Sequence, residues 1–320
     1  MNRMPLILVT LFWAIAPAAA QNTKDPLPLI GWLRVASPDP FPGQPLAQAL
    51  TRHGLVEGRD YRLEVRLALG DIARMPTLAT ELVKERPRII VTFGPDATRA
   101  AMAATSTIPI VAASAFVEEG LASSLARPKG NLTGVNMLVT ELAPKNLEVL
   151  KEILPQVRHV AVLNDASTKI PGRPAAMIAA AEALGFELTT VNVKSPDEFE
   201  TAFMAFKKAG ATALVVNSST LFAAMRSQIG ELARKHQLPA LCQWRAMVEA
   251  GCLASYGFPL DELFELTAEQ VAKVLRGARP EDLPIVQPRR FELVVNLKVA
   301  TALGLAIPPP ILIRADEVIE

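Results

Sequence analysis

The hydrophobic positions of this chain fall into two kinds of segment that alternate along most of its length. Short apolar runs rich in β-branched residues, such as 88–92 and 213–216, are typical of strands covered on both faces of a sheet. Between such runs lie segments with an apolar stripe and a charged face, such as 75–86, which predict helices. Strands that alternate with helices in this way predict an α/β fold with parallel sheets and right-handed crossovers.

The alternation occurs twice, which predicts two doubly wound lobes with a cleft between them. The first set has predicted strands at 29–35, 61–67, 88–92, 108–112 and 131–137, and predicted helices at 46–53, 75–86, 97–104 and 118–126. The second set has predicted strands at 160–163, 187–193, 213–216, 239–242 and 252–256, and predicted helices at 144–153, 175–184, 197–209, 221–236 and 245–249.

Further elements follow the second set: a helix at 262–276, a strand at 291–296 and a helix at 297–303. The chain is therefore expected to cross between the lobes more than once, and several crossings form a hinge. We expect the first lobe to comprise 29–141 with about 259–288, and the second 142–258 with about 289–320.

The first twenty residues have the pattern of a cleavable signal peptide. Arg3 supplies a positive start, 5–15 is mostly apolar but short for a membrane span, and small residues at 18–20 form a cleavage site. An uncleaved N-terminal anchor is the alternative. With no cysteine at the cleavage point, we expect a periplasmic protein without a lipid anchor, in which 21–28 is a flexible leader.

Composition and charge exclude some partners. The chain has 320 residues, of which 50% are hydrophobic and 20% charged, enough for two separate cores. Loss of residues 1–20 would remove Arg3 and leave equal numbers of basic and acidic residues. A neutral chain of this kind does not suggest binding to nucleic acid or to an anionic membrane surface.

The two cysteines are expected to be small buried residues rather than a disulfide. Cys242 ends one predicted strand and Cys252 begins the next. If these strands are parallel neighbours, the thiols lie at opposite ends of the sheet, whereas a disulfide needs Cα atoms within about 7 Å.

No constellation of residues suggests catalysis or metal binding. The three histidines, His53, His159 and His236, are not close in sequence to a cysteine or to clustered acids. The nucleophile-elbow, zinc-protease, Walker A and dinucleotide motifs are absent from the sequence. We therefore expect no catalytic residue, metal or cofactor, although an absent motif does not exclude an enzyme.

Polar and aromatic residues gather at the predicted strand ends, where open parallel sheets bind ligands. These residues are Ser37, Asp39, Asp96, Ser114, Asn164, Asp165, Asn217, Ser218, Ser219, Trp244, Arg245, Ser255 and Tyr256. Small polar residues also cap helices and shape turns, so each one has a structural alternative. Trp244 and Tyr256 could equally belong to the core, and Arg245 could pair with a ligand carboxylate or with a surface acid.

Several longer segments resemble the tryptophan/tyrosine-binding-like family of solute-binding proteins of ABC transporters. They include GLVEGRDYRLEVR at 54–66, LATELVKERPRIIVTFG at 78–94, ATSTIPIV at 104–111, GLASSLARPKGNLTGV at 120–135, VEAGCLASYG at 248–257 and the whole of 291–320. The resemblance covers about 29–320. It implies a type I periplasmic binding fold with two Rossmann-like lobes, three crossover segments and a ligand in the cleft.

The same resemblance implies a set of ligand-binding residues. Carried over by position, they are Ser37, Gly94, Pro95, Ser114, Asn164, Asn217, Ser218 and Tyr256. The chain departs from the family pattern at 115–117, where Ala-Phe-Val replaces a frequent Asp-Pro-Val, and around Trp244. We add Phe116 and Trp244 to the candidate site, because ligand preference is expected to depend on these departures.

The sequence thus predicts a receptor that delivers a small organic solute to an inner-membrane ABC permease by hinge closure. An amino acid is the first expectation for the ligand and an aromatic carboxylate the second. We expect a monomer that uses no cofactor. An enzyme acting in the same cleft and a ligand-sensing domain of a regulator are the alternatives.

Overall fold

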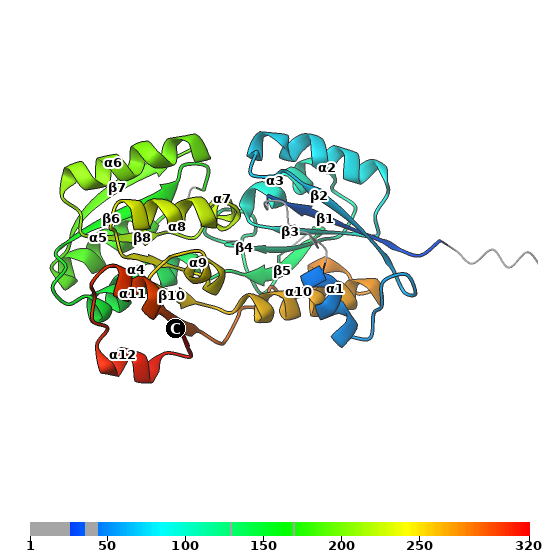
Figure 1. Ribbon diagram of the computed structural model, residues 1–320. Helices are drawn as coiled ribbons and strands as arrows, with labels where there is room; N and C mark the ends of the chain where they lie inside the picture. Colours follow the sequence, from blue (N-terminus) through cyan, green and yellow to red (C-terminus); the bar gives the residue numbers. More distant parts are fainter. Residues whose placement is uncertain (1–25, 36–43, 129, 169) are drawn as a thin grey trace, which may run out of the picture.

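The computed structural model describes residues 26–35, 44–128, 130–168 and 170–320, and it forms two lobes side by side (Figure 1). The predicted signal peptide and the candidate residue Ser37 lie outside the described residues. Each lobe is a sheet with helices on both faces, so the predicted α/β class and two-lobed architecture are confirmed. Within the described residues, no helix combines the length and the apolar character that crossing a membrane requires.

The first lobe is built on a parallel sheet of order β2-β1-β3-β4-β5. Its strands are β1 (Leu29–Arg34), β2 (Arg62–Leu67), β3 (Ile89–Phe93), β4 (Ile110–Ser114) and β5 (Leu132–Asn136). Helices α2 (Met75–Lys84) and α3 (Pro95–Ala104) pack together on one face, and α1 (Gln44–Arg52) packs with α10 (Leu260–Leu275) on the other. Strands β3, β4 and β5 are almost wholly buried, because both of their faces are covered.

The second lobe has a sheet of order β12-β11-β10-β9-β8-β6-β7, parallel except where β10 pairs with β11. Its strands are β6 (His159–Asp165), β7 (Glu187–Val193), β8 (Ala213–Val216), β9 (Ala240–Cys242), β10 (Ala254–Gly257), β11 (Glu292–Asn296) and β12 (Glu317–Ile319). Its helices are α4 (Val139–Ile153), α5 (Arg173–Leu184), α6 (Phe199–Ala209), α7 (Thr220–Ala224), α8 (Arg226–Lys235), α9 (Arg245–Glu249), α11 (Leu297–Ala302) and α12 (Pro309–Arg314).

The chain passes between the sheets after β5, after β10 and before β11. Before the last of these passages, the chain runs along the edge of the first sheet. There, Val286 N donates to Gly134 O at 3.0 Å and Asn136 N donates to Val286 O at 2.7 Å. Helix α10 thus packs on the first sheet, whereas β11 and β12 extend the second.

Two of the expected helices differ in the structure. The predicted helix at 118–126 is wrong, because the chain there forms successive turns, with Gly120 at φ +68°. The predicted helix at 221–236 is split into α7 and α8 at Met225, which lies outside the helical region at φ −99°, ψ 21°. Both differences affect the region between the lobes, since they place Glu119 beside β4 and Arg226 at the start of α8.

Candidate ligand-binding site

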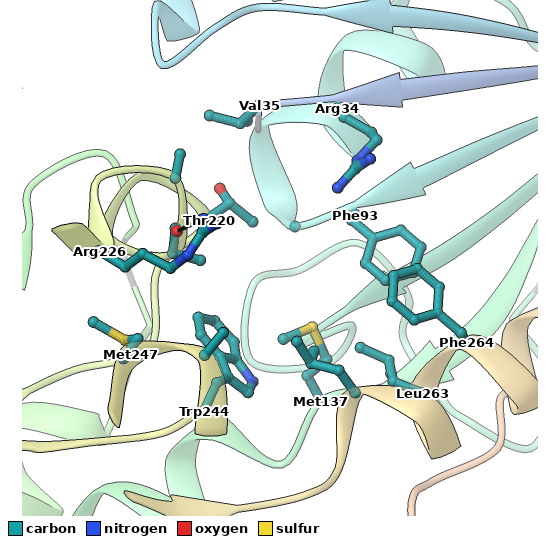
Figure 2. A pocket seen from close by; sticks show the side chains of 15 residues that line it. Arg34, Val35, Phe93, Met137, Thr220, Arg226, Trp244, Met247, Leu263 and Phe264 are labelled. Atoms are coloured by element: carbon teal, nitrogen blue, oxygen red, sulfur yellow. Dashed lines mark hydrogen bonds between the residues drawn. The ribbon is translucent and has the colours of Figure 1, made fainter. Parts of the chain in front are cut away.

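A cavity of about 180 Å³ lies between the two lobes, at the carboxyl ends of their strands (Figure 2). Its walls come from both lobes and from α10. The lining residues are Arg34, Val35, Phe93, Gly94, Met137, Thr220, Ala223, Ala224, Arg226, Trp244, Ala246, Met247, Leu260, Leu263 and Phe264. This is the position at which open parallel sheets bind ligands.

Most of the lining is apolar, and three of the side chains are aromatic. Phe93 and Phe264 lie with their ring centroids 5.0 Å apart, and both contact the buried ring of Trp32 behind them. Trp244 faces them from the second lobe and is only 5% exposed. A cavity with these walls suits a ligand with a flat or branched apolar body.

Two arginines supply the charge of the cavity. Figure 2 shows Arg34 and Arg226 extending toward its interior from opposite lobes. The guanidinium carbon of Arg34 lies 4.3 Å from the ring centroid of Trp32, and Arg226 Nη1 donates to Ala223 O at 3.2 Å. Among the described lining residues there is no aspartate or glutamate. Planar guanidinium groups bind carboxylates and phosphates through two parallel hydrogen bonds, so Arg226 favours an anionic ligand group.

A second, narrower cavity of about 20 Å³ continues from the first and shares Gly94, Met137, Thr220 and Trp244 with it. At this point the lobes are in direct contact. A Cβ atom placed on Gly94, which has φ +81°, would lie 2.5 Å from Thr220 Cγ2 in the other lobe. Only glycine permits this approach, and the lobes are therefore closed on each other in this structure.

Ionisable side chains from both lobes border the narrow cavity. The Glu119 side chain is 2% exposed, accepts a hydrogen bond from Ser114 Oγ at 3.3 Å, and lies 3.7 Å from Arg99 Nη2. Burial raises the pKa of Glu119 to about 7, although Arg99 and Ser114 act in the opposite direction. Burial and the nearby charge of Asp165 also raise the pKa of Asp96. Within the described residues, no group of three or more metal-binding side chains is found.

The candidate residues from the sequence are distributed over several places. Gly94 and Trp244 line the main cavity, and Pro95, Ser114 and Ser218 line the narrow one. These five residues come together from three strand ends and the segment after β9. The selection of polar and aromatic residues at predicted strand ends therefore identified residues that lie between the lobes.

The other candidates lie elsewhere. Asn164 and Asn217 line a separate groove of about 500 Å³ on the second lobe, where Asn217 Nδ2 donates to Asn164 Oδ1 at 2.5 Å. Phe116 is fully buried in the core of the first lobe. Tyr256 stacks on Phe291 with centroids 6.1 Å apart, outside the lining of the main cavity.

The lining residues that the sequence did not indicate are Arg34, Arg226 and the aromatic face of α10. Arg34 ends a strand, so the strand-end criterion could have found it. Phe264 could not be found in this way, because its place depends on how α10 packs across the first sheet.

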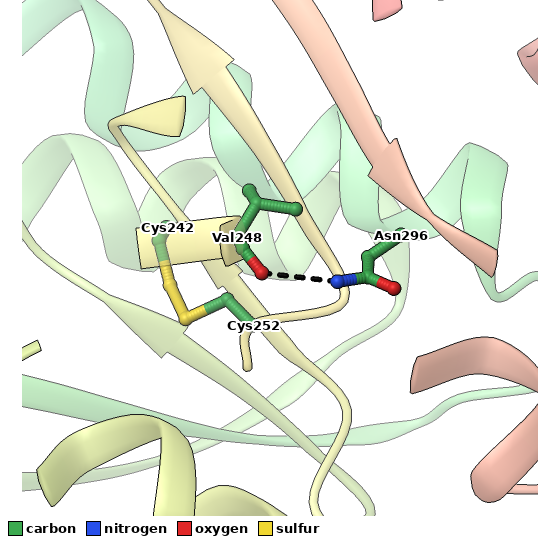
Figure 3. The surroundings of a disulfide bond; sticks show 4 residues. All are labelled: Cys242, Val248, Cys252 and Asn296. Atoms are coloured by element: carbon green, nitrogen blue, oxygen red, sulfur yellow. Dashed lines mark hydrogen bonds between the residues drawn. A yellow bond between two sulfur atoms is a disulfide. The ribbon is translucent and has the colours of Figure 1, made fainter. Parts of the chain in front are cut away.

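A disulfide joins Cys242 to Cys252, contrary to the expectation from the sequence (Figure 3). The expectation was wrong because β10 begins at Ala254, so that Cys252 lies outside the strand, in the turn after α9. The Cα atoms are therefore 6.7 Å apart. The disulfide joins the two ends of the segment 242–252, which carries the lining residues Trp244, Ala246 and Met247. Asn296 Nδ2 also contacts this segment, because it donates a hydrogen bond to Val248 O at 3.1 Å.

Comparison with known proteins gives one family and several relatives. The family model described as ABC transporter substrate binding protein matches residues 43–319. A tyrosine-binding protein of Clostridioides difficile (strain R20291) is 23% identical over 263 residues, which are 81% of this chain and 75% of the relative.

Solved structures show the same fold. A conserved domain protein from Vibrio cholerae has a TM-score of 0.83 at 25% identity, covering 91% of this chain and 99% of the other. A Streptococcus pneumoniae ABC domain in complex with L-Trp has a TM-score of 0.83 at 24% identity, covering 92% and 100%. More distant matches include a regulator of the LacI family, which has the type I periplasmic binding fold. The predicted type I periplasmic binding fold is therefore confirmed.

Proposed function

Because the chain belongs to the ABC transporter substrate binding protein family, we propose that it is the periplasmic solute-binding component of an ABC importer. In this role the open lobes bind a solute, close around it by a hinge motion, and present the closed form to an inner-membrane permease. The observation that carries the proposal is a cavity enclosed by both lobes, with aromatic walls and two arginines.

The proposed ligand is an amino acid or an aromatic acid with an apolar side chain. Phe93, Phe264 and Trp244 contact the apolar body, while Arg34 and Arg226 attract the carboxylate. Relatives that bind tyrosine or L-Trp support this ligand class. Of the candidates from the sequence, Gly94 and Trp244 have the strongest support as ligand-binding residues, because they line this cavity.

The proposed location rests on two features. Residues 1–20 have the pattern of a signal peptide, and disulfides persist in oxidising compartments such as the periplasm. Fractionation of cells and N-terminal sequencing test this, with a mature chain that starts at Gln21 as the expected result. Size-exclusion chromatography with light scattering is expected to give a monomer.

Thermal unfolding in the presence of candidate ligands tests the function. Purified mature protein is screened against the twenty amino acids and a panel of aromatic acids. A ligand present at a thousand times its Kd adds about 4 kcal/mol of stability, which gives a clear rise in Tm. If no member of either class raises the Tm, the proposed ligand class is wrong.

The alternative is an enzyme that acts in the same cleft, and it differs from a binding protein in that it converts the bound compound. After incubation with the protein, mass spectrometry is expected to recover the bound compound unchanged and in a 1:1 ratio. Conversion of the compound by the wild-type protein, but not by a variant with a blocked cavity, would overturn the binding role.

A further inference from the structure

Charged and hydroxyl side chains from both lobes gather around the narrow cavity, next to the ligand cavity. They are Asp96, Arg99, Ser114 and Glu119 of the first lobe, and Asp165, Ser167, Arg173 and Ser219 of the second. Among the described residues, this set contains three carboxylates and two guanidinium groups. When the lobes are closed, these carboxylates lie in a space from which water is largely excluded.

The three carboxylates differ in the number and length of the hydrogen bonds that they accept. Asp165 accepts hydrogen bonds from Ser219 Oγ at 2.5 Å, from Ser167 Oγ at 2.6 Å and from Ser167 N at 2.8 Å. Glu119 accepts one long bond, from Ser114 Oγ at 3.3 Å. Asp96 Oδ2 is buried without a partner among the described residues, and Asp96 Oδ1 lies 4.0 Å from Arg99 Nη1.

The charged groups that face Glu119 come from two elements, one in each lobe. Arg99 and Asp96 belong to α3 of the same lobe, and Arg173 begins α5 of the other lobe. Arg173 is 5% exposed, and its Nη1 has no hydrogen-bond partner among the described residues. Neither arginine forms a short ion pair with Glu119, since the closer one is 3.7 Å away.

The second lobe encloses Glu119. The wall opposite it consists of Thr168, Ile170, Ser218, Ser219, Thr220 and Trp244, all from that lobe. Separation of the lobes would remove this wall and allow water to reach the carboxylate. The protonation equilibrium of Glu119 therefore differs between the closed and open states.

We propose that closure of the lobes is coupled to uptake of a proton by Glu119, so that solute capture strengthens as the pH falls through neutrality. The proposal concerns regulation of the site described above, and its link to solute capture rests on the proposed function. A periplasmic receptor of this kind would hold its solute more tightly in acidic surroundings.

The sign follows from the two protonation states. Burial raises the pKa of Glu119 in the closed state to about 7, whereas a hydrated glutamate has its ordinary value of 4.5. Between these values the closed state binds more protons than the open state, so lower pH favours closure. From this difference we expect the Kd to be about tenfold lower at pH 6 than at pH 8.

Calorimetric titration with L-tryptophan as the probe tests the coupling. We expect wild type to take up about three-quarters of a proton on binding at pH 6.5, measured in buffers of different ionisation enthalpy. Glu119→Gln keeps an acceptor for Ser114 without a charge, so it is expected to bind tightly at both pH 6 and pH 8. The neighbouring Glu118→Gln is the matched control and is expected to keep the wild-type pH dependence.

A second measurement does not depend on the ligand. Small-angle scattering of the ligand-free protein from pH 5.5 to 8.5 is expected to show a more compact wild type at low pH, and no such change for Glu119→Gln. If L-tryptophan does not bind, the proposed function loses support while this experiment still tests the coupling. The same pH response in wild type and Glu119→Gln, in either experiment, would overturn the proposal.

Discussion

Gly94 is the residue whose replacement tests closure of the lobes most specifically. In Gly94→Ala the added Cβ would lie 2.5 Å from Thr220 Cγ2 and 3.2 Å from Thr220 Oγ1 across the cleft. Both atoms belong to the other lobe, so the clash exists only in the closed state. Overpacking of this kind costs about 1–3 kcal/mol, which corresponds to a Kd roughly 5- to 150-fold higher.

The backbone at Gly94 adds a second, separate effect. Its dihedral angles of φ +81°, ψ 168° lie in a region that is essentially restricted to glycine, and alanine there costs about 1–3 kcal/mol. This strain is present in the open and closed states alike, so it lowers the Tm without changing the Kd. Gly54→Ala is the matched control, because Gly54 has φ +80° and no atom within 4 Å of the added Cβ.

The assay compares Tm and the Kd for L-tryptophan in four proteins: wild type, Gly94→Ala, Gly54→Ala, and Gly94→Ala combined with Thr220→Ser. Thr220→Ser removes the clashing methyl group and keeps the hydroxyl, so the double variant is expected to regain most of the affinity. If Gly94→Ala loses stability but binds like Gly54→Ala, or if Thr220→Ser gives no rescue, the contact between the lobes does not control closure.

Three further predictions concern the walls of the site. Replacing Cys242 and Cys252 together by serine should lower the free energy of unfolding by about 2–3 kcal/mol for a ten-residue loop, measured by urea denaturation, and should weaken ligand binding. Unchanged stability would refute a structural role for the disulfide. Arg226→Met should raise the Kd for L-tryptophan about tenfold but leave that for L-tryptophanamide unchanged, since the amide has no carboxylate. Equal effects on both ligands would contradict this. Ser219→Ala should destabilise the protein by about 1–2 kcal/mol, because Ser219 Oγ caps α7 and donates to Asp165, and a Tm equal to wild type would argue against it.

The two lobes could be predicted from the sequence because their strands carry a strong local signal. The runs at β3 and β8 are apolar on both faces, and only a strand buried between layers of helices requires this. The Gly94-Pro95 turn was found for the same reason, since it directly follows such a strand.

The rest of the site depends on contacts between distant segments. Arg226 was missed because 221–236 has continuous helical periodicity, which gives no sign of the break at Met225. Glu119 was missed because 118–126 was expected to be a helix, whereas its turns place the side chain against Ser114. The disulfide was missed because the predicted strand at 252–256 included Cys252, whereas β10 begins at Ala254 and leaves Cys252 in the preceding turn.

In the proposed function, the two lobes enclose a small solute with a carboxylate and an apolar body. Native mass spectrometry of the exported protein tests it most directly, followed by identification of the compound released on denaturation. We expect one such compound per chain, with its mass absent from the Gly94→Ala variant or reduced there. A protein that carries no solute and binds none of the amino or aromatic acids offered, or one that carries a solute without a carboxylate, would contradict it.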